Sequence, residues 1–309
     1  MTTKGKAMAE STASQSVPQM IAAVDGSAIS YHAVAWGAVE AVLRRRQLHI
    51  LTSMAVPGGF GPGMALSDAD MEWMRRDGER ILTEAGRIAR EAVPGAELVL
   101  TTEVSFDFLI PTLIDRSHDV KMLVVGSRGI GAFQRGMLGS VSTAVTRHAH
   151  CPVAVIHDIS GITPEWTDKP VVVGVDGSDN SVPAIELAFE EASLRKVGLT
   201  AVHTWSDVTG LDIPMADWDA VLESEQVLLD EQLAGYQERY PDVPVRRVVK
   251  VDRPARALLD ESEHAQLLVV GSHGRGGFAS MLLGSTSNKL LHSAQCPMIV
   301  VRDRERPPA

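Results

Sequence analysis

The sequence LVVGSRGIGAFQRGMLGS at residues 123–140 recurs as LVVGSHGRGGFASMLLGS at residues 268–285. In both copies an apolar run ends in a glycine, a second glycine follows after two residues, and a third glycine and a serine follow after nine more. Upstream, AAVDGS at residues 22–27 recurs as VGVDGS at residues 173–178. Self-similarity at a fixed period is the signature of repeated structural units. The protein therefore consists of two copies of one unit, the second being six residues shorter between these segments.

Each copy alternates short apolar runs with amphipathic helical segments, which indicates βαβ units and a parallel sheet covered by helices on both faces. The expected strands are residues 20–25, 48–54, 97–104, 120–126 and 152–158 in the first copy, and 170–176, 199–205, 245–251, 265–271 and 297–303 in the second. The right-handed crossover rule makes each copy a doubly wound domain. Ligands of such domains bind beyond the carboxyl ends of the strands.

The length of 309 residues also favours two domains. We expect a disordered tail at residues 1–16, a first domain at 17–158, a linker at 159–168 and a second domain at 169–305. The linker is polar and contains glycine and proline, as is typical of a short connection between domains.

Composition limits the classes of partner. A net charge of −10 disfavours a nucleic-acid partner, and no apolar run reaches the roughly 18 residues that a membrane span needs. Two cysteines do not make a disulfide framework, and His148, His150 and Cys151 lack the fourth ligand that a structural zinc site needs. We expect a cytoplasmic protein without a metal centre of its own.

The repeated glycine spacing is typical of a phosphate-binding loop. Glycines allow positive φ and a close approach of the backbone to a ligand. Ser140 and Ser285 begin a helix, whose free N–H groups favour an anion, and Ser142 and Ser287 in the first turn add hydroxyl donors. The alternative is a tight turn with a serine as the helix cap. The duplication of the whole spacing favours phosphate binding.

Asp25 and Asp176 end the first strand of their copies and face the same crevice as the glycine loop. Each carboxylate could accept hydrogen bonds from ribose hydroxyls, or could form an Asx turn, because Asp-Gly-Ser is strong turn chemistry. The sequence leaves these two roles open. A Walker-type phosphate loop is absent, and so is any recognisable catalytic motif.

These motifs together resemble the universal stress proteins, in particular the tandem, two-domain type, over both copies. The resemblance implies Rossmann-like domains of the adenine nucleotide alpha hydrolase type, each with a five-stranded parallel sheet of order 3-2-1-4-5. It also implies one ATP site per copy, with Mg²⁺ accompanying the nucleotide. The implied binding residues are Ala23, Asp25, Ser53, Gly126, Gly129, Gly139, Ser140, Val141 and Ser142 in the first copy, and Gly174, Asp176, Thr204, Gly271, Gly274, Gly284, Ser285, Thr286 and Ser287 in the second.

The first copy departs from the family pattern at one point. Family members usually carry a Pro-Ala pair before the third helix, which the second copy keeps as Pro254-Ala255, whereas the first copy has Leu109-Ile110. We therefore expect the first site to be the weaker one.

The leading functional hypothesis is an ATP-binding regulator of stress response or growth state, without a catalytic residue. The alternatives are a slow ATPase and a nucleotide-independent interaction module. The last strand of each copy is apolar and lies at an edge of the 3-2-1-4-5 sheet, where an uncovered edge is a liability. We therefore expect residues 152–157 and 297–302 to pair, and whole chains to form a homodimer, as the tandem relatives suggest.

Overall fold

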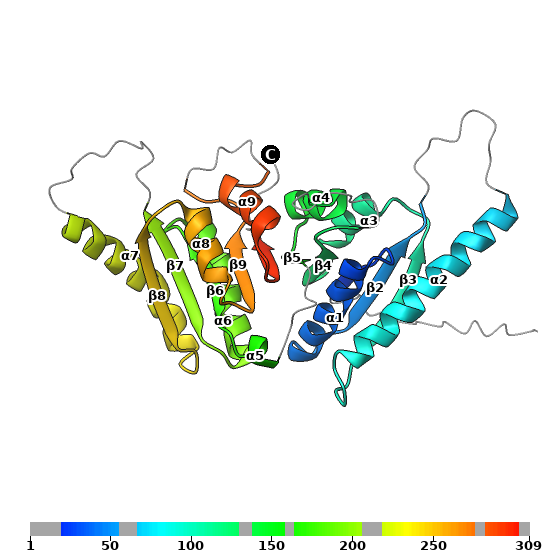
Figure 1. Cartoon of the computed structure of the whole chain (residues 1–309), viewed down its shortest axis with the longest axis horizontal. Coiled ribbons are helices and arrows are strands. Elements are labelled where there is room, and N and C mark those ends of the chain that lie inside the picture. Colours follow the sequence, from blue (N-terminus) through cyan, green and yellow to red (C-terminus); the bar gives the residue numbers. More distant parts are fainter. Residues whose placement is uncertain are drawn as a thin grey trace, which may run out of the picture.

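The two copies form one continuous sheet (Figure 1). The structure, a computed structural model, describes residues 20–55, 67–129, 138–157, 164–205, 218–275 and 282–302. The predicted tail at residues 1–16 lies outside these ranges. Within them, ten strands follow the order β3-β2-β1-β4-β5-β10-β9-β6-β7-β8. Each half of this order is the predicted 3-2-1-4-5 arrangement, so the predicted fold class is confirmed.

The elements follow the predicted alternation of strands and helices. The first copy contains β1 (Met20–Ala23), α1 (Ala28–Leu43), β2 (Leu48–Ser53), α2 (Asp68–Glu91), β3 (Leu100–Ser105), α3 (Leu109–Arg116), β4 (Met122–Gly126), α4 (Ser140–His148) and β5 (Val153–Ile156). After the short helix α5 (Pro164–Thr167), the second copy contains β6 (Val171–Val175), α6 (Val182–Arg195), β7 (Leu199–Trp205), α7 (Trp218–Arg239), β8 (Val245–Val251), α8 (Pro254–Ser262), β9 (Leu267–Gly271), α9 (Ser285–Ser293) and β10 (Met298–Val301).

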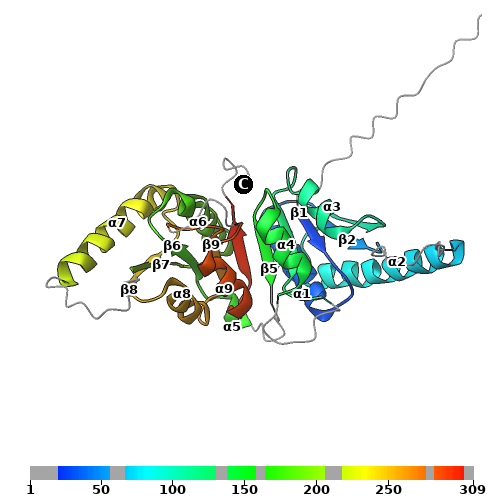
Figure 2. The ribbon, with the colours of Figure 1, turned by 90° about the horizontal axis from the view of Figure 1, so that it is seen from above.

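The last strands of the two copies join the halves of the sheet. Strand pairs within each copy are parallel, whereas β5 and β10 are antiparallel, with Val155 opposite Met298 and Val153 opposite Val300. Figure 2 shows β5 and the red β10 side by side at the centre of the molecule. The expected pairing of these two edges is confirmed.

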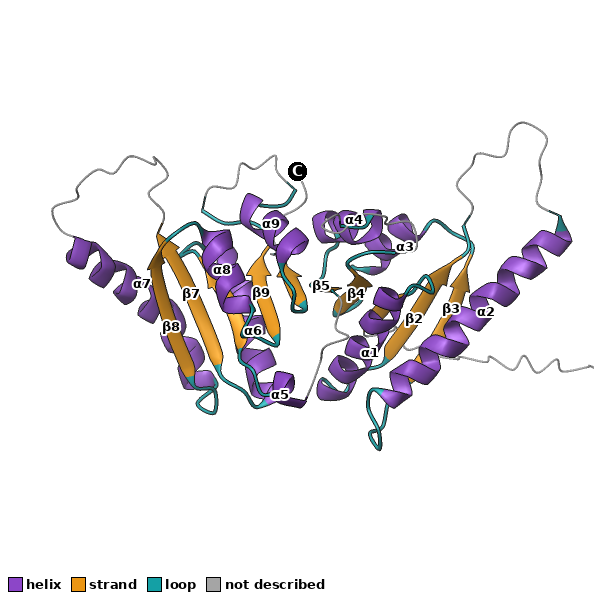
Figure 3. Ribbon diagram, viewed as in Figure 1, coloured by secondary structure: helices purple, strands orange, loops and turns teal. Residues whose placement is uncertain are grey.

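Helices cover both faces of the sheet (Figure 3). One buried cluster contains residues of α1, α2, α6 and α7, with Phe189 among its largest members. The other contains residues of α4, α8 and α9 together with Leu113 of α3. Strand residues contribute alternately to the two clusters, because successive side chains of a strand point to opposite faces.

Local sequence signals explain where α2 begins. The hydroxyl of Ser67, the cap of α2, accepts a hydrogen bond from the Asp70 amide, and the Asp70 carboxylate accepts one from the Ser67 amide. This reciprocal pair is a capping box, which satisfies amides that a helix start leaves unpaired. In the described part of the chain, no helix is both long and apolar enough to cross a bilayer.

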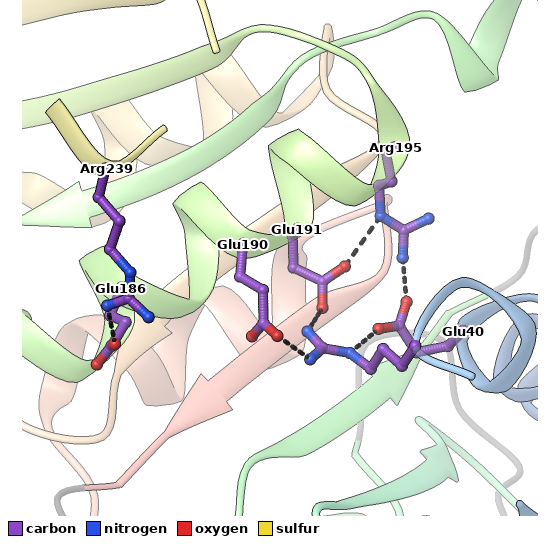
Figure 4. A network of polar contacts seen from close by, with 7 residues as sticks. Glu40, Glu186, Glu190, Glu191, Arg195 and Arg239 are labelled. Atoms are coloured by element: carbon purple, nitrogen blue, oxygen red, sulfur yellow. Dashed lines mark hydrogen bonds and ion pairs between the residues drawn. The ribbon is translucent and has the colours of Figure 1, made fainter. Parts of the chain in front are cut away.

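Buried charges hold the two copies together on the α1 and α6 side of the sheet (Figure 4). The side chains of Glu40 and Glu191 are fully buried, and Arg44 and Arg195 are nearly so. Arg195 pairs with Glu191 on its own helix at 3.1 Å and with Glu40 of the other copy at 2.5 Å. Arg44 likewise pairs with Glu40 and with Glu191. The four residues, which we call the charge cluster, form an approximately two-fold arrangement across the boundary between the copies.

Candidate functional site

Each copy has a cavity where its strands end at their carboxyl side. The cavity of the first copy, site 1, has a volume of about 860 Å³, and that of the second, site 2, about 560 Å³. Both volumes lie in the range of small-molecule and cofactor sites. This position is the crevice in which doubly wound sheets bind their ligands.

All the residues that the resemblance implied lie around these two cavities. Site 1 is lined by Ala23, Asp25, Ser53, Gly126, Gly129, Gly139, Ser140, Val141 and Ser142. Site 2 is lined by Gly174, Asp176, Thr204, Gly271, Gly274, Gly284, Ser285, Thr286 and Ser287. The fold thus brings four separated stretches of each copy to one place.

The carboxylates at the ends of β1 and β6 are held by Asx turns. Asp25 Oδ1 accepts hydrogen bonds from the amide and the hydroxyl of Ser27, at 3.0 and 2.6 Å. Asp176 Oδ1 accepts the same pair from Ser178, at 2.9 and 2.7 Å. The structural role that the sequence left open is therefore real. The same bonds fix each carboxylate at the wall of its cavity, where it could also face a ligand.

The second glycine of each loop lies directly against this carboxylate. A methyl group at Gly274 would approach Asp176 Oδ2 to 2.6 Å, and one at Gly129 would collide with Asp25 Oδ2. The need for glycine here is steric: the loop backbone packs onto the carboxylate.

The third glycine of each loop is a helix cap in extended backbone, and the expectation of positive φ is wrong there. Gly139 has a φ of −67° and Gly284 one of −65°. Among the described glycines, positive φ occurs at Gly26, Gly95 and Gly177. The first and last of these follow Asp25 and Asp176, so the positive φ that favours glycine belongs to the Asp-Gly-Ser turn.

The helices α4 and α9 present their N-termini to the cavities. In the described chain neither helix start has a side-chain cap hydrogen bond, and the first residues, Ser140 and Ser285, are exposed. Uncapped amides at a helix start favour an anion. The hydroxyls of Ser142 and Ser287 are committed within the protein, since each donates to a backbone carbonyl of its glycine loop, at 3.2 Å to Ser127 and 2.7 Å to Gly271.

Several cavity residues were not predicted. In site 1, Asp77 and Arg80 of α2 form an ion pair of 2.7 Å at the cavity wall, and Thr52 lines the cavity with its hydroxyl buried and unpaired among the described residues. In site 2, Trp205 and Arg275 line the cavity. Asp77 and Arg80 could not be found from the repeat, because they have no identical counterpart in the second copy.

The two sites differ in which elements supply their arginine side chains. The Arg275 amide donates to Asp176 Oδ2 at 2.6 Å, and its guanidinium lies over Gly177. In site 1 Arg80 reaches the cavity from helix α2, and Arg128 joins it from the glycine loop. The sites therefore share a backbone cradle but have different charged walls.

The missing Pro-Ala pair leaves the start of α3 unchanged. The caps Phe108 of α3 and Arg253 of α8 have nearly the same backbone angles, −62° and 123° against −67° and 127°. Leu109 and Pro254, the first residues of these helices, each line their cavity. The start of this helix thus has the same backbone geometry in both copies.

Comparison with known proteins identifies relatives of the whole chain. The model of the "Universal stress protein family" matches residues 18–157 and 168–302. A universal stress protein of Mycobacterium tuberculosis (strain H37Rv) is 46% identical over 92% of this chain and 96% of its own. A second one from the same strain is 40% identical over the same shares. The crystal structure of a universal stress protein from Archaeoglobus fulgidus superimposes with a TM-score of 0.65 at 20% identity, covering 92% of this chain and 98% of that one.

Proposed function

The chain belongs to the universal stress protein family, and from that premise we propose that it binds ATP in both copies and regulates stress response or growth state. The observation that supports this most is the duplicated constellation of a strand-end carboxylate, a glycine loop packed on it and an uncapped helix N-terminus around each cavity.

The chemistry of the cavity walls suits the three parts of the nucleotide. Asp25 and Asp176 are acceptors for the ribose hydroxyls, and the amides at the starts of α4 and α9 are donors for phosphate oxygens. The apolar walls, which include Ala23 and Val125 in site 1 and Val202 and Leu258 in site 2, suit the adenine ring. Mg²⁺ would arrive with the phosphates, which it binds through oxygen atoms.

We infer that the protein acts by binding rather than by turnover. Among the described residues around the two cavities, Asp25 and Asp176 are the carboxylates that occur at equivalent positions in both copies, and no histidine does so. Both carboxylates are held in Asx turns. The regulatory output then depends on nucleotide occupancy, which shifts the population of conformations or assemblies. We propose a cytoplasmic homodimer as the working form of the protein.

The proposal is tested by calorimetric titration of nucleotide-free protein with MgATP and with 2′,3′-dideoxy-ATP, which lacks both ribose hydroxyls. ATP should bind, and the dideoxy compound should bind at least about tenfold more weakly because a hydrogen bond to a charged group contributes about 1.5–3 kcal/mol. In the Asp25→Ala, Asp176→Ala double variant, which has no acceptor for the ribose hydroxyls, the two ligands should bind alike. Absence of ATP binding at millimolar concentration would overturn the proposal.

A further inference from the structure

The strands that join the copies are bonded directly to the two glycine loops. Ile156, the last residue of β5, accepts a hydrogen bond from the Ser127 amide at 2.8 Å, and the Ser127 carbonyl accepts one from Gly139, the cap of α4, also at 2.8 Å. In the second copy Val301 of β10, Ser272 and Gly284 repeat this relay with two bonds of 2.7 Å. We call the antiparallel pair of β5 and β10 the seam, and α4 and α9 the site helices. In each copy, two successive hydrogen bonds therefore connect the seam to the start of the site helix.

The residue after each of these strands reaches into the other copy. Arg302, which follows β10, donates through Nη2 to the carbonyl of Arg147 in the last turn of α4, and also to the carbonyl of Leu282 at 2.9 Å. Leu282 stands two residues before Gly284, the cap of α9. One guanidinium thus connects the far end of the site 1 helix to the glycine loop of site 2.

The equivalent residue of the first copy makes the reciprocal contact. His157, which follows β5, places Nε2 at 3.0 Å from the carbonyl of Leu291 in α9. Across the seam, Arg302 of the second copy therefore contacts α4 of the first, and His157 of the first copy contacts α9 of the second.

A second connection runs along the opposite face of the sheet. Helix α1 begins at the Asx turn of Asp25, and α6 follows the Asx turn of Asp176 after one 3-10 turn at Asp179–Ser181. Both helices end at the charge cluster, where Arg44 pairs with Glu191 and Arg195 pairs with Glu40 of the other copy. Paired at both faces, the copies cannot shift relative to one another without breaking buried polar contacts. The boundary between the copies is therefore held by polar contacts on both faces of the sheet.

We propose that the two sites bind nucleotide with positive cooperativity, and that Arg302 carries the coupling. The inference rests on the proposed function, since it concerns the same two sites. Phosphate binding at site 1 fixes α4, whose terminal carbonyl holds Arg302. Arg302 in turn holds Leu282, two residues before the cap of α9. A helix start that is already held in place loses less conformational entropy when its own ligand binds, so the second ATP binds more tightly.

The coupling is measured by comparing the full chain with variants in which one site is blocked. Gly129→Val blocks site 1 and Gly274→Val blocks site 2, because each side chain displaces the neighbouring aspartate. Titration of each with MgATP gives the association constant of one site while the other is empty. Titration of the parent chain gives two macroscopic association constants. Their product, divided by the product of the two single-site association constants, is the coupling factor.

We expect a coupling factor of at least about 5 in the parent chain and close to 1 in an Arg302→Met background, in which the apolar stem is kept and the donors are lost. Arg302→Lys, whose side chain is one bond shorter and ends in an ammonium group instead of a planar guanidinium, should reach the two carbonyls less well and also lower the factor. The matched control is Arg147→Met, which removes a neighbouring charge but leaves the carbonyl that Arg302 contacts. It should keep the parent value.

If two ATP bind to the parent chain but the coupling factor is 1, the inference is overturned. It is also overturned if Arg302→Met leaves the coupling factor unchanged. Failure of ATP to bind to the parent chain would instead overturn the proposed function. A thermal melt of each variant establishes that it is folded, and Arg302→Lys serves in place of Arg302→Met should the latter not fold.

Discussion

Gly274 lies so close to Asp176 that a methyl group on the glycine would come within 2.6 Å of the carboxylate oxygen Oδ2. Gly129 and Asp25 have the same relationship in the first copy. The glycine loop and the end of the first strand are therefore one structural unit: the carboxylate supports the loop, and the loop restricts the carboxylate to one position. We regard this contact as the basis of each site.

Gly129→Ala and Gly274→Ala should each weaken ATP binding at their own site by about tenfold or more, because the added methyl group displaces the aspartate from the ribose. Calorimetry of each variant with MgATP measures the effect. Gly235→Ala is the matched control, since a methyl group there meets nothing within 4 Å. A loop variant with the affinity of the parent at both sites would show that the carboxylate does not hold the ribose.

Ser140→Glu and Ser285→Glu should each abolish ATP binding at one site while leaving the fold at least as stable as before. Both residues are exposed at a helix N-terminus, where a carboxylate interacts favourably with the helix dipole and repels phosphate. The neutral variants Ser140→Gln and Ser285→Gln, which are of the same size, should retain measurable binding. Equal affinities of the Glu and Gln variants would contradict phosphate binding at the helix starts.

The contribution of Glu40 to stability should be lost as the pH rises through neutrality. Burial, with the neighbouring Glu191 carboxylate, raises the pKa of Glu40 from 4.5 to about 7. A pKa that is raised on folding stabilises the folded chain below the unfolded value, and this stabilisation is lost as the pH rises through about 7. In urea unfolding at pH 5.5 and pH 8, the change in the free energy of unfolding of the parent should differ from that of Glu40→Gln by a loss on the order of 1–3 kcal/mol. Histidines with lowered pKa, such as His157, contribute equally to both proteins and cancel in this comparison. Parallel pH dependences in the two proteins would contradict this assignment.

Arg195→Met should destabilise the chain by roughly 3–5 kcal/mol, because it leaves Glu40 and Glu191 buried with half their positive charge removed. Arg239→Met is the control: its pair with Glu186, also drawn in Figure 4, is exposed on both sides, at 61% and 50%. Exposed pairs contribute at most about 1 kcal/mol. Equal losses for the two variants in urea unfolding would show that the charge cluster is not a structural core.

The sequence predicted the fold because its signals are local and duplicated. Alternation of apolar runs and helices predicted the strands, and the open apolar edges predicted the pairing of β5 with β10. The charge cluster could not be predicted. Glu40 with Arg44, and Glu191 with Arg195, are spaced as ordinary pairs on the surface of a helix, and only the tertiary arrangement buries them against each other.

The site was predicted to the extent that it consists of repeated residues. The duplicated motifs identified the walls that both copies share. Arg80 and Asp77 come from α2 and were missed, because no repeated residue marks them. The positive φ was assigned to the loop glycines, whereas the structure has it at Gly26 and Gly177, since the Asx turn, rather than the helix cap, requires a left-handed residue.

Native mass spectrometry of nucleotide-free protein with increasing MgATP tests the central claim most directly, because it counts ligands per chain. We predict two ATP per 33.2 kDa chain, one in Ser140→Glu, one in Ser285→Glu and none in the double variant. A chain that takes up no ATP, or that keeps two in the double variant, would contradict the account.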